Sequence, residues 1–99
     1  MDEELVHRIK SCAIDICVKA WSANKINAST NIVNRNLRYK LQREAWMLCN
    51  DMATYIGIAK HVFHLREKRI LYWNSLITSE QALLQAWIES DVERYGQPQ

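Results

Sequence analysis

The histidines and cysteines are the residues whose spacing could support metal or redox chemistry. His61 and His64 lie three residues apart, so they could share one helix face, but a zinc site needs further ligands. Cys49 lies too far away, and Glu67 alone is a weak third ligand. Cys12 and Cys17 do not have the C-x-x-C redox spacing. The chain also lacks a glycine-rich phosphate loop and a recognisable nucleophile–base pair. The sequence therefore predicts a protein that is not an enzyme and has no metal, no cofactor and no small-molecule substrate.

Glu80 is the most unusual charged residue, because it lies midway between Trp73 and Trp87 in the centre of an apolar helical stripe. Burying an unpartnered carboxylate there would cost several kcal/mol. Glu80 should therefore be paired or reach solvent at an edge of the stripe. Of these we predict the pair, in which Glu80 is a structural charge that meets a basic side chain inside the bundle or across an interface.

Positive charge is concentrated in one part of the chain. Residues 16–43 contain no acid and six cations, namely Lys19, Lys25, Arg35, Arg38, Lys40 and Arg43. After Ile70 the sequence contains four acidic residues and a single basic one, Arg94. The net charge of +2 thus combines a basic and an acidic end. The basic segment could bind nucleic acid, with its cations on phosphates and bases stacked on Tyr39 and Trp46. It equally suits a protein interface rich in arginine and aromatic residues. The third alternative is a basic face that only contacts solvent.

The composition predicts one soluble domain over residues 1–95 with a frayed tail at 96–99. The chain has 99 residues, an ordinary apolar and charged content, two glycines and one proline. It lacks a run of about 20 apolar residues, so we expect no association with a membrane. The acidic start lacks the order of a signal peptide. Three cysteines in apolar segments predict free, buried thiols in the cytoplasm.

Apolar periodicity predicts three helices, over residues 2–24, 30–61 and 67–91, with Ser29 or Thr30 as the N-cap of the second. Helices of these lengths with short connections predict an all-α, up-down-up bundle. The predicted core positions are Leu5, Val6, Ile9, Cys12, Ala13, Ile16 and Ala20, then Leu37, Leu41, Ala45, Leu48, Met52, Tyr55, Ala59 and Phe63, then Ile70, Trp73, Ile77, Leu84, Trp87 and Ile88.

The first two helices each carry a second apolar stripe. At 100° per residue these stripes lie away from the predicted core, on residues Ile14, Val18 and Trp21, and Ile32, Tyr39, Trp46 and Ala53. Burial on both sides predicts that a second copy or another partner covers them, so we expect a homo-oligomer. The alternative is that these are scattered exposed apolar residues, which are normal on soluble proteins.

The chain resembles one known group of helical bundles. Residues 8–16 and 38–59, the stretch 55–65, and residues 67–90 ending in Ala86-Trp87-Ile88 are similar to the four-helix accessory proteins of diversity-generating retroelements and to related proteins of ribosomal-RNA intervening sequences. The resemblance covers residues 5–90 and rests mostly on apolar positions. It implies subunits in closed rings, a basic surface that binds RNA or DNA, and docking on a reverse transcriptase.

Three departures from that family are visible. Its first helix has no counterpart in this chain, the serine that normally caps its last helix is replaced near Arg66, and Glu80 stands at a usually apolar position. A missing helix would leave an apolar groove that something else must fill. Two functions therefore follow from the sequence. One is an oligomeric accessory protein that binds nucleic acid through the six cations. The other is a protein–protein adaptor, with a phage as one candidate source, whose groove receives a partner's helix.

Overall fold

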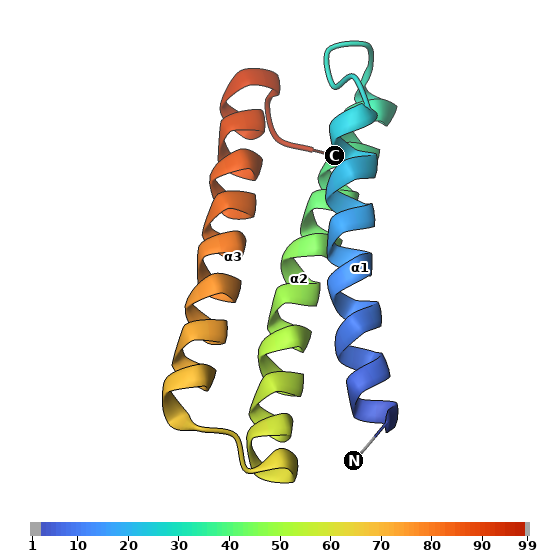
Figure 1. The fold of residues 1–99 in the computed structure, drawn as a ribbon. Coiled ribbons are helices and arrows are strands. Elements are labelled where there is room, and N and C mark those ends of the chain that lie inside the picture. The colour runs from blue at the N-terminus through green and yellow to red at the C-terminus, as the bar shows by residue number, and fades with distance from the viewer. Residues whose placement is uncertain (1–2, 99) are drawn as a thin grey trace.

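A computed structural model describes residues 3–98 as three α-helices: α1 (Glu3–Lys25), α2 (Ile32–Phe63) and α3 (Glu67–Tyr95). The described residues include no strand, so the predicted all-α fold is confirmed. The helices run up, down and up, with α2 between α1 and α3 (Figure 1). The expected start of the first helix at Asp2 lies outside the described residues. Within residues 3–98, none of the helices is both long and apolar enough to cross a membrane.

The connection between α1 and α2 is organised by asparagines. Asn31 is the N-cap of α2, and its side-chain oxygen accepts a hydrogen bond from the backbone N–H of Asn34 at 2.9 Å. The expected cap at Ser29 or Thr30 is therefore wrong. The hydroxyl and backbone N–H of Ser29 instead donate to the side-chain oxygen of Asn27, which folds the loop locally.

The turn between α2 and α3 needs neither glycine nor proline. His64 ends α2 in the left-handed conformation, with φ of 52°, and its N–H donates to the carbonyl of Lys60. Lys60 also forms an ion pair with Glu67 in the first turn of α3. Arg66 is the N-cap residue of α3, and its side chain makes no capping hydrogen bond. This agrees with the replacement of the family's capping serine near Arg66. At the far end α3 runs four residues beyond the expected Asp91, to Tyr95.

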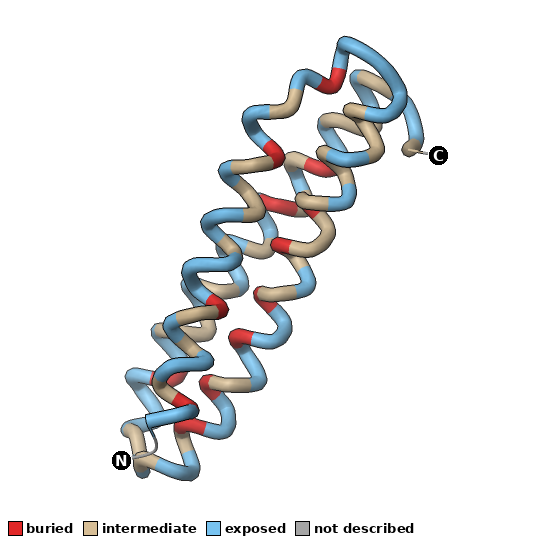
Figure 2. Tube along the Cα trace, turned by 90° about the vertical axis from the view of Figure 1, so that its right-hand side faces the viewer, coloured by how far each residue is buried: buried red, intermediate tan, exposed pale blue. Residues whose placement is uncertain are grey.

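The buried stripe of α2 is rotated from the expected one. Its buried members recur at alternating three- and four-residue spacing, as Gln42, Ala45, Cys49, Met52, Ile56 and Ala59. Leu37, expected in the core, is 47% exposed. As the middle helix, α2 has neighbours on two sides, so a broad arc of its surface must be apolar. Figure 2 shows buried positions recurring along the length of the bundle.

The outer helices are joined through α2 and do not pack closely on each other. Two buried clusters, one around Cys12, Met52, Ile56 and Ile70 and one around Ala45, Cys49 and Leu84, hold α1 and α3 to α2. Across residues 3–98, the Cα atoms of α1 and α3 nowhere approach within 8 Å. The bundle is therefore open along one side.

Candidate partner-binding groove

An apolar groove runs between α1 and α3, with α2 as its floor. It consists of two adjoining hollows of about 970 and 640 Å³ that share the lining residues Ala13, Met52, Leu76 and Ile77. Along α1 the lining extends from Val6 to Asn24, a helical length of about 27 Å. We call this feature the α1–α3 groove. It lies along the open side of the bundle, where α1 and α3 each pack on α2 and not closely on each other.

The walls of the α1–α3 groove combine small and aromatic side chains. On α1 these include Ala13 and Ala20, while α3 contributes Trp73 and Trp87, both half-buried. Ala13 was expected in the core and is exposed, because its methyl group faces the open groove. The described residues that line the groove include two with formal charges, Lys10 and Glu80. The surface is therefore suited to apolar association.

Glu80 lies in the α1–α3 groove and is exposed. Within residues 3–98 its carboxylate has no hydrogen bond or ion pair. The prediction of a basic partner inside the bundle is therefore wrong. The reason is the open side of the bundle, which admits water to a position that a closed bundle would bury. A partner across an interface stays a prediction.

The predicted second stripe of α1 is exposed. Ile14, Val18 and Trp21 have exposed fractions of 61%, 53% and 66%. Trp21 also lines the α1–α3 groove, so the stripe and the groove form one continuous apolar surface. The stripe lies on the side of α1 that points away from α2. Its assignment as an interface stays a prediction.

The predicted second stripe of α2 is only partly on the surface. Trp46 is half-buried against the cluster of Ala45, Cys49 and Leu84, and its carbonyl accepts a hydrogen bond from Gln81 of α3. Tyr39 is half-buried beside Gln42 and Asp91. Placing these two rings opposite the core was wrong, because that side of α2 faces α3.

The remaining members of that stripe, Ile32 and Ala53, are exposed, with Ile32 at 36%. The expected interface on α2 is therefore reduced to these two small surfaces.

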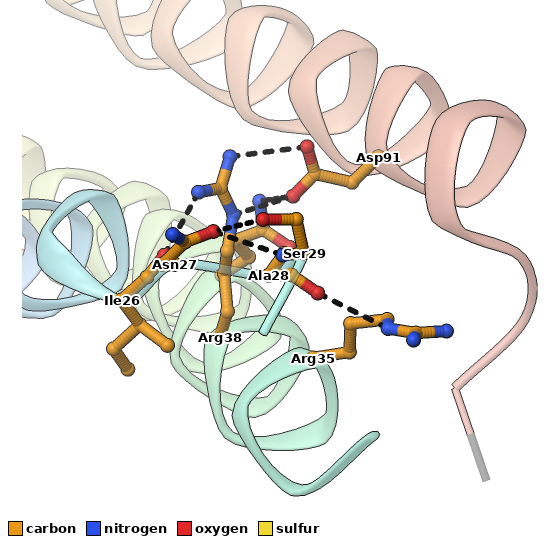
Figure 3. Close-up of polar contacts among 8 residues, drawn as sticks. Ile26, Asn27, Ala28, Ser29, Arg35, Arg38 and Asp91 are labelled. Atoms are coloured by element: carbon orange, nitrogen blue, oxygen red, sulfur yellow. Dashed lines mark hydrogen bonds and ion pairs between the residues drawn. The ribbon is translucent and has the colours of Figure 1, made fainter. Parts of the chain in front are cut away.

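Three of the six predicted phosphate-binding cations bind within the chain. Arg38 pairs with Asp91 of α3, with N–O distances of 2.6 and 3.1 Å, and also donates to the carbonyl of Ile26 (Figure 3). Arg35 donates to the carbonyls of Ala28 and Tyr95. These arginines hold the α1–α2 connection and the end of α3 together.

Lys19 forms the third intrachain contact, an ion pair with Glu44 at 2.7 Å. The hydrogen bond from its ammonium lowers the pKa of the Glu44 carboxyl. The other three cations have no carboxylate partner within hydrogen-bond distance in the described part of the chain. Lys25 lies over the ring of Trp21 and Arg43 over that of Trp46, while Lys40 is exposed.

The basic and acidic ends of the sequence lie at the same end of the bundle. The α1–α2 connection and the end of α3 are neighbours (Figure 1), and Arg38 spans them to reach Asp91. Folding therefore neutralises part of the charge that looked separated along the chain. Pro98 is half-buried and lines a small hollow together with Ala28 and Arg35. The frayed tail stays a prediction, and Gln99 lies outside the described residues.

In residues 3–98, no group of three or more His, Cys, Asp and Glu could hold a metal ion. All three thiols are free. Cys12 and Cys49 are buried as expected, and burial raises the pKa of both. Cys17 is exposed on the wall of the α1–α3 groove, so its expected burial is wrong.

Sequence reasoning missed Gln42, which is fully buried in α2. Its amide donates to Asp91 at 2.9 Å, alongside Arg38. The signal was present in the spacing to Ala45 and Cys49, but a polar residue is ordinarily discounted as a core position.

Comparison with protein-family models, with curated proteins and with solved structures finds no match for this chain. The resemblance to the retroelement accessory proteins therefore stays a prediction.

Proposed function

We propose that this chain is a non-enzymatic protein-binding module whose α1–α3 groove accepts one amphipathic α-helix of a partner protein. The observation that carries the proposal is the groove itself, which is apolar, open and bounded by two helices that do not pack closely on each other. A soluble protein gains by covering such a surface.

A helix is the occupant whose shape suits the groove best. The space between two helices over a third is where the fourth helix of a bundle packs, and helix-in-groove docking is a common mode of peptide recognition. A helix of about 18 residues has the groove's length of about 27 Å. The aromatic walls at Trp73 and Trp87 offer anchoring contacts of the kind that dominate binding energy.

A partner helix suits the groove better than the exposed stripe of a second copy. That stripe, from Ile14 to Trp21, covers seven residues and about 10 Å, well short of the groove. Lys10 and Lys25 flank it, so insertion of more of α1 would bring ammonium groups against apolar walls.

Leu76→Asp is expected to weaken helix binding at least tenfold, because Leu76 is 52% exposed and lines both hollows. The probe is a synthetic amphipathic helix of about 20 residues, with leucines on one face and a lysine at the centre of that face. Binding is measured as slower alkylation of Cys17, which lies on the groove wall. Cys12 and Cys49 are buried and contribute little background.

Leu71→Asp is the matched control, because Leu71 is 62% exposed on the same helix and does not line the groove. It is expected to leave binding unchanged. Equal loss in both variants, or no protection of Cys17 by the helix, would argue against the proposal. Protection that rises with the protein's own concentration, without added helix, would assign the groove to a second copy and overturn it.

Nucleic-acid binding in support of a reverse transcriptase is a second candidate, favoured by the cations that form neither an ion pair with a carboxylate nor a hydrogen bond to a carbonyl in residues 3–98. Lys25, Lys40 and Arg43 are the members of the predicted set in this position. Two of them lie over tryptophan rings, an arrangement that also suits protein interfaces.

A salt titration with duplex DNA tests this second candidate. Three phosphate contacts are expected to give a log–log slope of about −2.7, and a smaller value with single strands. The triple variant with alanine at Lys25, Lys40 and Arg43 should abolish binding. A slope between about −4 and −6 would show that further cations contact phosphate. These would be Lys19 and Arg38 after their intrachain ion pairs open, or the exposed Arg66, Lys68 and Arg69.

A further inference from the structure

The α1–α3 groove has a carboxylate in the middle of one wall, and we infer that Glu80 selects partner helices that carry a lysine or arginine at the centre of their apolar face. The inference rests on the proposed function. It adds the chemistry of the occupant, which the apolar lining alone does not specify.

Glu80 occupies a central position on its wall. It lies seven residues, about 10 Å, from both Trp73 and Trp87, so the three side chains share one line along α3. Leu76, Ile77 and Met52 also line the groove around this region. A helix docked along the groove therefore crosses Glu80 near the middle of its apolar face.

Docking changes the surroundings of Glu80 from water to side chains. The carboxylate is exposed now and has no hydrogen bond or ion pair within residues 3–98, so covering it with an apolar residue would remove its hydration without replacement. The negative charge of Glu80 already affects the core, because it contributes, after burial, to the raised pKa of the Cys49 thiol. A partner cation would replace the lost hydration and neutralise this field.

The same reasoning makes Glu80 a device for discrimination. A helix with leucine or glutamate at the crossing point leaves an unpaired or repelled buried charge, whereas a helix with lysine or arginine does not. Lys10 is the second charged group of the groove, but it is exposed near one end, where a salt bridge contributes little. Selectivity is therefore expected to depend on Glu80.

Three synthetic helices, identical apart from lysine, glutamine or glutamate at the central apolar-face position, test the inference against the full chain. Their dissociation constants are measured by protection of Cys17 from alkylation. The lysine helix is expected to bind about tenfold more tightly than the glutamate helix. Glu80→Gln should reduce this ratio to near one, and Glu80→Lys should reverse the order.

Glu89→Lys is the matched control, because Glu89 is an exposed carboxylate on α3 outside the groove. It should preserve the order of the three helices. If all three helices protect Cys17 equally in the wild type, or if Glu80→Gln leaves their order unchanged, the inference fails while the proposed function stands. If none of the three helices protects Cys17, the proposed function fails and the inference with it.

Discussion

Asp91→Ala is expected to lower the free energy of unfolding by about 3 kcal/mol. The Arg38–Asp91 pair is shielded from water, with side-chain exposures of 15% and 17%, and the guanidinium binds both carboxylate oxygens. Gln42 donates to the same carboxylate from a fully buried position. Removing Asp91 leaves the partly buried Arg38 guanidinium with the Ile26 carbonyl but no counter-ion, and it removes the acceptor of the buried Gln42 amide. Urea unfolding followed by far-UV circular dichroism measures the loss.

Glu93→Ala provides the control for this prediction. Glu93 is an exposed carboxylate two residues further along α3, and its removal should change the unfolding free energy by less than about 0.5 kcal/mol. Combining Asp91→Ala with Arg38→Ala should give a coupling energy of about 2 kcal/mol in a double-mutant cycle. A loss for Asp91→Ala as small as that for Glu93→Ala would show that water replaces the carboxylate in solution.

The number of helices could be predicted from the sequence because apolar periodicity is local. The predicted and observed stripes of α2 share Ala45, Met52 and Ala59. They differ because the rotation of a helix depends on its neighbours, and α2 must meet α1 and α3 on different sides. Trp46 illustrates the difference, since its position suggested an outer face and its ring packs beside α3.

The pairing of charges could not be predicted in the same way. Arg38 and Asp91 are 53 residues apart, and each belongs to a segment that looks uniformly charged along the chain. Only the up-down-up topology brings the end of α3 beside the α1–α2 connection. A basic run in a sequence therefore overstates the cations that remain available to a ligand.

The candidate site could be predicted in part. The apolar stripe of α1 and the position of Glu80 between two tryptophans were visible in the sequence. A groove was expected because the family that the chain resembles has a first helix without a counterpart here. The solvent exposure of Cys17 was not predicted, and that of Glu80 was one of two alternatives. Periodicity places both residues on or near apolar stripes without showing that α1 and α3 stay apart. An open side of a bundle is a property of three helices together.

Cys49 makes the stability of the fold sensitive to alkaline pH. Burial, followed by the nearby charge of Glu80, raises the pKa of its thiol from the ordinary value of 9.0 to about 11. Between these two values the unfolded chain loses the thiol proton and the folded chain keeps it, so the stability contributed by the neutral thiol is complete below the lower value and falls as the pH rises. The loss is expected to be on the order of 2 kcal/mol.

Cys49→Ala isolates this contribution from the lysines and tyrosines that titrate in the same range. At a pH of about 8 the variant should be less stable than the wild type by about 1 kcal/mol, because it leaves a small cavity. At a pH of about 10.5 the difference should vanish or change sign, since alanine has no proton to lose. Parallel stability curves for Cys49→Ala and the wild type would show that the buried thiol ionises as readily in the folded chain as in the unfolded one.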